Sequence, residues 1–169
     1  MFKMRRTQSF CAIGLCLWSA VVIGRQAAPP AALSDTLRAH VKSEPFYIVT
    51  SIRGLPLGVR AALQTLWGSG TLDIADPGAA FSADGELLVV PGLPGRRLVA
   101  AGCSPDNHCL VYYERGGRGG RTWLVALFHW TPDATRLEFA GTAPAGLKTV
   151  EDVRKAVLSG AIKGPNSLW

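Results

Sequence analysis

The two cysteines in the second half of the chain could carry chemistry, because they lie very close together. Cys103 and Cys109 enclose the segment Ser-Pro-Asp-Asn-His. In an oxidising compartment, two cysteines this close around a turn sequence are expected to form a disulfide. His108 adjoins Cys109, but the spacing lacks the paired CxxC pattern of zinc sites, so no metal site is expected here. The disulfide either fixes a recognition loop or is only a structural staple, and both interpretations remain open.

The other side chains that could do chemistry are scattered along the sequence. His129 lies in an apolar run that is expected to be largely buried, where a hydrogen-bonded strand histidine is the ordinary case. His40 is expected on the solvated face of a short helix. No serine stands in a nucleophile elbow, and cysteines in a disulfide offer no nucleophile, so we expect no enzyme and no catalytic residues. Catalysis would need a cleft that gathers His129 or His108 with Glu114 or Glu138.

The N-terminal 24 residues have the pattern of a secretory signal peptide. Three basic residues, Lys3, Arg5 and Arg6, precede the uncharged residues 10–24. That stretch is shorter than the roughly 20 residues that cross a bilayer, and Val22 and Gly24 are small residues at the −3 and −1 positions for cleavage before Arg25. We expect export to the periplasm, with residues 1–24 removed. The alternative is an uncleaved anchor that holds the domain at the inner membrane.

Composition and charge narrow the classes of partner. The chain has 169 residues, of which 48% are hydrophobic and 18% charged, enough for one domain with a core. Its formal charge of +6 falls to +3 without residues 1–24, because three of the basic residues lie there. The basic segment 115–121 is read as a solvated hairpin, and aromatic residues at RNA-binding spacing are missing. We expect a protein partner, no nucleic acid and no cofactor.

Helical patterns flank the region that could carry function. Residues 25–45 are expected to be a tether, within which Ser34 caps a brief helix. Pro56 can start a second helix, and Thr149 with Asp152 resembles a capping box for a third. The apolar stripe of this last helix consists of Val150, Val153 and Val157.

Strand signals dominate the second half of the chain. Five runs bounded by Gly, Pro or Asp predict strands over residues 86–90, 97–101, 110–114, 122–130 and 136–139. Strands spaced this closely favour an antiparallel sheet, since parallel strands need long crossovers. We therefore expect a single α+β domain over residues 46–169. It should contain one antiparallel sheet of about five strands, with helices packed on it and a helix at the C-terminal end.

The order of these segments resembles the Ivy family, periplasmic inhibitors of vertebrate-type lysozyme. Family members show a strand, a small disulfide loop reading Cys-Lys-Pro-His-Asp-Cys, three more strands and a C-terminal helix. Here the corresponding segments cover residues 97–164, and the loop reads Cys-Ser-Pro-Asp-Asn-His-Cys. The loop encloses five residues where the family has four, and His108 is displaced toward the second cysteine.

The resemblance implies a function and a set of contact residues. Family inhibitors insert the loop histidine into the lysozyme cleft, between the two catalytic carboxylates. Carried over by position, His108 should project from the surface, on a partner-binding loop made of Cys103, Pro105, Asp106, His108 and Cys109. The implied function is inhibition of a c-type lysozyme. The alternative is an envelope-binding module on the same fold with a different partner, which the altered loop and the net positive charge favour.

Overall fold

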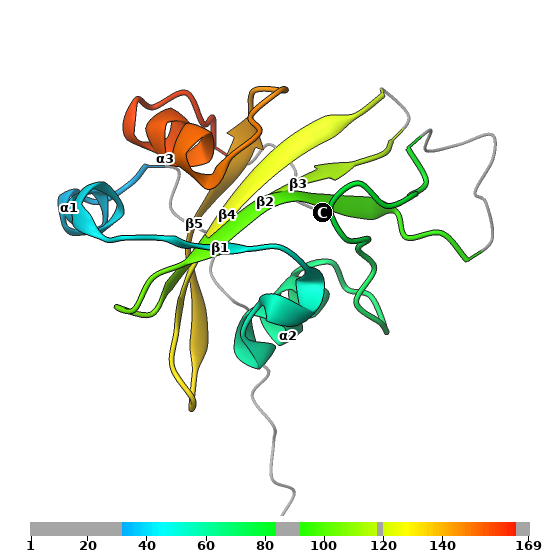
Figure 1. Ribbon diagram of the computed structural model, residues 1–169, viewed down its shortest axis with the longest axis horizontal. Coiled ribbons are helices and arrows are strands. Elements are labelled where there is room, and N and C mark those ends of the chain that lie inside the picture. The colour runs from blue at the N-terminus through cyan, green and yellow to red at the C-terminus, as the bar shows by residue number, and fades with distance from the viewer. Residues whose placement is uncertain (1–31, 84–91, 118–119, 165–169) are drawn as a thin grey trace, which may run out of the picture.

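Five antiparallel strands form one sheet in the order β1-β2-β3-β4-β5 in the computed structural model, which describes residues 32–83, 92–117 and 120–164 (Figure 1). The strands are Tyr47–Val49 (β1), Arg96–Cys103 (β2), His108–Arg115 (β3), Thr122–Trp130 (β4) and Thr135–Ala143 (β5). From β2 to β5 each strand pairs with its neighbour in the chain. The expected α+β fold with one antiparallel sheet is confirmed. The strand expected over residues 86–90 lies outside the described residues.

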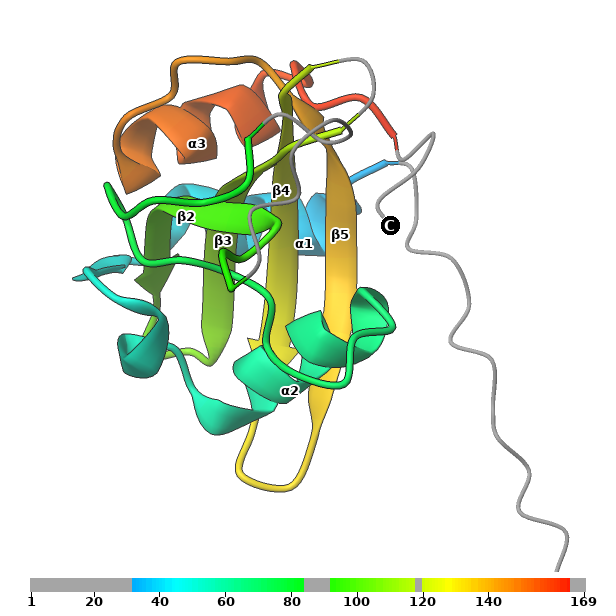
Figure 2. The same cartoon turned by 90° about the vertical axis from the view of Figure 1, so that its right-hand side faces the viewer.

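Helices cover both faces of this sheet. Helices α1 (Asp35–Ser43) and α3 (Val150–Leu158) lie on one face, and α2 (Leu57–Leu66) lies on the other (Figure 1, Figure 2). A short 3-10 turn, Ile52–Gly54, connects β1 to α2. Each face has its own apolar cluster, and the central strands β3 and β4 are buried over most of their length. The sheet is therefore the middle of three layers.

The alternation of side chains along β3 decides which of them meet α1. Leu110 and Tyr112 belong to the cluster beneath α1 and α3, whereas Val111 belongs to the cluster beneath α2. His108 has the parity of Leu110 and Tyr112, so its side chain faces α1. Its register partner on β4 is His129. Two histidines therefore lie side by side at the end of the sheet.

The capping residues predicted from the sequence begin both helices on that face. Ser34 Oγ accepts a hydrogen bond from the Leu37 amide at 3.2 Å. Thr149 and Asp152 form a reciprocal capping box, with bonds of 3.1 and 3.0 Å between side chain and backbone. These bonds satisfy amide groups that have no partner within the helix. The predicted stripe of α3 is buried, and it consists of Val150, Val153 and Val157.

Helix α1 corrects the expected start of the domain. Leu37 and Val41 are buried in the cluster shared with α3, and Arg154 Nε donates a hydrogen bond to the Val41 carbonyl at 2.6 Å. The segment expected as a tether, 25–45, therefore belongs to the folded domain from Leu33 onward. The reason is that its apolar stripe completes the core on this face of the sheet.

The structure describes the basic segment 115–121 only in part and the N-terminal segment 1–24 not at all. The expected signal segment, 1–24, lies outside the described residues. Within the part of the chain that the structure does describe, no helix is both long and apolar enough to cross a membrane. The strands on either side of the basic segment, β3 and β4, pair antiparallel as a hairpin requires, and residues 118 and 119 between them lie outside the described residues. Gly120 there has a φ of +98°, which glycine adopts without strain.

Candidate functional site

The predicted disulfide between Cys103 and Cys109 closes the tight turn that joins β2 to β3. The two cysteines are register partners at the ends of these strands. Asn107 has a left-handed φ of 66°, a conformation that asparagine tolerates better than most residues. The Asn107 amide donates to the Ser104 carbonyl at 3.2 Å, and the Trp130 amide donates to the Asn107 carbonyl at 2.8 Å. The turn is thus held within itself and to β4.

This turn exposes Pro105 and Asp106 but buries His108. The histidine is only 6% exposed, whereas the two residues at the tip face solvent. The expectation that His108 projects from the surface is therefore wrong. The physical reason is that His108 is the first residue of β3, where strand alternation turns its side chain toward α1.

His108 is held by a buried carboxylate that the sequence analysis did not single out. Glu44, at the C-terminal cap of α1, is 4% exposed, and both of its oxygens lie 3.0 Å from His108 Nδ1. His40, one helical turn earlier, places its Nδ1 2.5 Å from Glu44 Oε1. Ser104 Oγ donates to Glu44 Oε2 at 2.5 Å. A single carboxylate thus joins α1 to the disulfide turn through Ser104 and His108, and it also holds His40 of the same helix.

Burial and hydrogen bonding act in opposite directions on the pKa of Glu44. Burial raises it, because a low-dielectric interior disfavours the charged form. Hydrogen bonds from Ser104, His108 and His40 lower it, and they prevail, so the pKa of Glu44 lies below its ordinary value. Glu44 is therefore an anion at neutral pH, surrounded by donors from α1 and from the turn.

All three histidines of the chain meet at this place. The ring centroids of His40 and His108 are 4.8 Å apart, and those of His108 and His129 are 5.2 Å apart. The three rings line a cavity of about 390 Å³. The charged residues that complete its wall are Asp106, Arg136 and Glu138. His40 was expected on a solvated face of a helix, and its side chain is indeed 45% exposed. The same side chain bonds to Glu44 and lines the cavity.

The cavity meets the condition that catalysis would require, a cleft that gathers one of the two histidines with one of the two carboxylates. It gathers His108 and His129 with Glu138, but Glu114 is not among its lining residues. Glu114 lies toward the other end of β3, where its Oε1 accepts hydrogen bonds of 2.8 and 2.6 Å from Arg97. Ser104 has a hydroxyl in contact with the cluster, and it donates to the carboxylate of Glu44 instead of to an imidazole. Ser104 is thus not paired with a histidine in the way that activates a nucleophile.

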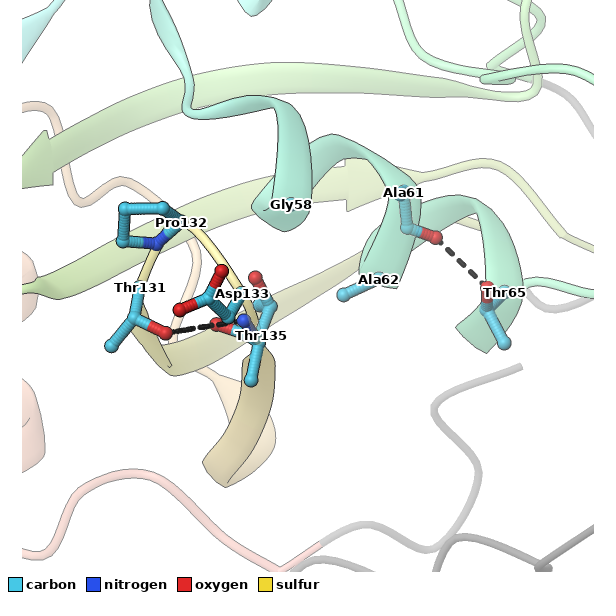
Figure 3. A pocket seen from close by; sticks show the side chains of 9 residues that line it. Gly58, Ala61, Ala62, Thr65, Thr131, Pro132, Asp133 and Thr135 are labelled. Atoms are coloured by element: carbon cyan, nitrogen blue, oxygen red, sulfur yellow. Dashed lines mark hydrogen bonds between the residues drawn. The ribbon is translucent and has the colours of Figure 1, made fainter.

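A second cavity lies between α2 and the turn that joins β4 to β5 (Figure 3). Its volume is about 300 Å³, and small side chains from the helix form one wall. Residues 131–135 form the other wall, and Thr131 Oγ1 accepts a hydrogen bond of 3.1 Å from the Ala134 amide. Asp133 is the one ionisable side chain among the lining residues. The concentration of histidines favours the first cavity as the functional site.

No family model matches this chain, and no curated protein or solved structure matches it either. The spacing of His40 and Glu44 is a sequence signal for a shared helix face. Their meeting with His108 spans 64 residues and depends on how α1 packs on the sheet. No local pattern in the sequence reports that contact.

Proposed function

We propose that this chain is an exported binding protein, not an enzyme, that inhibits a c-type lysozyme. The proposal is carried by one observation, the exposed Pro105 and Asp106 at the tip of a turn closed by the Cys103–Cys109 disulfide. A turn that is already ordered loses little conformational entropy when it docks. The expected order of strands around a disulfide loop, which motivated the resemblance to the Ivy family, supports the same proposal.

Exposed apolar side chains beside the turn also support a protein partner. Tyr47 is 66% exposed and Ile48 is 74% exposed, both on the edge strand β1. Tyr47 is the register partner of Cys103, so this strand flanks the base of the turn. Tyrosine is enriched at the centres of protein interfaces, where it contributes much of the binding energy. The proposed contact surface therefore combines the tip of the turn with β1.

The burial of His108 changes the mode of inhibition that the resemblance implied. In our proposal His108 is a positioning residue, which holds the turn against α1 through Glu44. In this proposal Asp106 contacts the basic surface of the partner and does not enter between its two catalytic carboxylates, which would repel a third carboxylate. An exposed carboxylate suits lysozymes of this type, which are strongly basic, because opposite charges speed encounter and orient the partner.

A second candidate function shares the fold and the surface but has a different partner. It is an envelope-binding module that does not inhibit lysozyme. One observation favours it, since a histidine that is 6% exposed is not available for insertion into a lysozyme cleft. Both candidates place the protein in the periplasm, free or held at the inner membrane by an uncleaved N-terminal segment. Neither needs a cofactor or a nucleic acid.

Direct assays with purified lysozyme separate these candidates. Under the first, the oxidised protein lowers the rate of cell-wall lysis by hen egg-white lysozyme and binds it in calorimetry with about 1:1 stoichiometry. Disulfide reduction should weaken both effects together, because the turn is then no longer preorganised. Full lytic activity and no heat of binding at about 100 µM protein would reject lysozyme as the partner and favour the second candidate.

A further inference from the structure

The cluster beneath the turn has the composition of a metal site. We propose that His40, Glu44 and His108 bind a zinc ion, with one coordination position open to the adjacent cavity. Each of the three side chains offers one ligand atom, and these atoms lie within 4.8 Å of one another. Two imidazoles and one carboxylate are a ligand set of zinc sites that keep a fourth position for water. This inference is independent of the lysozyme proposal.

The distances within the cluster are close to those that a bound ion requires. Tetrahedral zinc, with ligands at about 2.0–2.2 Å, places neighbouring ligand atoms roughly 3.3 Å apart. Nδ1 of His40 and Nδ1 of His108 now lie 2.5 and 3.0 Å from Glu44 Oε1. The nitrogen–oxygen pairs must therefore separate by less than about 1 Å, and ligand atoms at the 4.8 Å limit of the cluster must approach by about 1.5 Å. His40 can supply this movement, because its side chain is 45% exposed.

Glu44 is oriented as a metal ligand commonly is. Its Oε1 faces both imidazoles, and its Oε2 accepts a hydrogen bond from Ser104 Oγ. The same Oγ accepts a hydrogen bond from the His108 amide at 3.1 Å. Outer-shell hydrogen bonds of this kind fix the orientation of ligating side chains. Ser104 therefore holds Oε2, while Oε1 faces the two imidazoles with which it would share the ion.

The cavity supplies room for the fourth ligand. His40 and His108 both line it, and its volume of about 390 Å³ holds several water molecules. His129 lies beside the His108 ring, with its centroid 5.2 Å away. It lies outside the group of three and forms part of the cavity wall. The open coordination position would thus face solvent through a pocket lined by imidazole and carboxylate groups.

Zinc binding to the purified full-length protein, with its disulfide verified by thiol titration, tests the proposal. The ion alone, added as zinc sulfate, is the probe. We expect one zinc per chain, with a dissociation constant below about 10 µM in competition with a chromophoric chelator. His40→Ala should weaken binding at least about tenfold, since loss of an outer-shell partner alone costs 10–100-fold. Glu138→Gln, which alters the same cavity but not the ligands, should leave the affinity within about twofold.

Thermal unfolding provides the second readout. Zinc should raise the Tm of the wild type and of Glu138→Gln, because an ion that binds only the folded state stabilises it. The Tm of His40→Ala should not respond to zinc. If His40→Ala lowers the Tm of the metal-free protein, His40→Gln replaces it in the same comparison. Absence of zinc binding by the wild type, or equal affinities of wild type and His40 variants, would overturn the proposal and leave the cluster as hydrogen bonds alone.

Discussion

Glu44 and His108 are 64 residues apart in the chain, yet both carboxylate oxygens lie 3.0 Å from the imidazole Nδ1. The contact ties the C-terminal end of α1 to the first residue of β3. It also buries a charge, which is costly unless donors compensate for the lost water. His108 and the hydroxyl of Ser104 are such donors. Removal of the carboxylate should therefore lower the free energy of unfolding.

Glu44→Gln should lower the free energy of unfolding at pH 7 by about 2 kcal/mol, because charged acceptors make the stronger hydrogen bonds. The folded-state pKa of Glu44 is depressed. Its contribution to stability is therefore present above about pH 4.3, the ordinary value for glutamate, and is lost as the pH falls through the folded pKa. Urea denaturation at pH 7 and at pH 3 should show that the difference in free energy of unfolding between wild type and variant is smaller at pH 3.

Glu138→Gln is the matched control for that experiment. Glu138 lines the same cavity, but its ion pair is with Arg136, whose side chain is 75% exposed, and it should contribute little at either pH. An equal difference in free energy of unfolding between wild type and Glu44→Gln at pH 7 and pH 3 would contradict the proposed link between the Glu44 pKa and stability.

The disulfide should be complete and should stabilise the domain modestly. Thiol labelling of the protein from an oxidising compartment should modify neither Cys103 nor Cys109. Reduction should lower the free energy of unfolding by about 2.4 kcal/mol, the chain-entropy value for so small a ring. Urea titrations of the same preparation with and without reductant measure this difference. Extensive labelling of both cysteines would contradict the oxidised state on which the proposed binding turn depends.

Asp106→Ala should weaken lysozyme binding by about 2 kcal/mol or more, the range of an interface hot spot. The chain contains a matched control in its second exposed Pro-Asp turn, at Pro132 and Asp133 between β4 and β5 (Figure 3). Asp133→Ala should change the affinity by less than about 0.5 kcal/mol, as expected outside the buried centre of an interface. Calorimetry on both variants gives the comparison. Equal effects would mean that the disulfide turn is a staple and not the recognition element.

Thr149→Ala should lower the free energy of unfolding by about 1 kcal/mol, because the Asp152 amide at the start of α3 loses its acceptor. Thr149→Ser keeps the hydroxyl and should stay within about 0.5 kcal/mol of the wild type, since serine is an equally good cap. Denaturant midpoints of the two variants distinguish loss of the cap from loss of the methyl group. Similar destabilisation by both would attribute the effect to packing instead.

Much of the fold follows from local patterns in the sequence. The strand expected over residues 122–130 has the bounds of β4, and Ser34 and Thr149 cap the helices that they were expected to cap. These signals are local. A capping side chain accepts a hydrogen bond from an amide at most three residues later, and side chains along a strand alternate with a period of two. The pairing of Tyr47 with Cys103 joins distant segments, and no local pattern specifies it.

The candidate site was only half predictable for the same reason. The spacing of Cys103 and Cys109 predicts their disulfide, which the structure contains. The burial of His108 depends on the packing of α1, which supplies Glu44 from the segment expected as a tether. The contact between the buried charge of Glu44 and the distant His108 depends on tertiary packing. Neither composition nor periodicity predicts it.

The order of strands also has a kinetic consequence. Strands β2 to β5 pair as successive hairpins, so these contacts close short loops and should form early. Helix α1 joins the sheet through contacts such as the one between Glu44 and His108, which must close a much longer loop. Glu44→Gln should therefore speed unfolding in stopped-flow experiments and leave the folding rate nearly unchanged. The carboxylate between α1 and the turn would then govern the lifetime of the native state, not the speed at which it is reached.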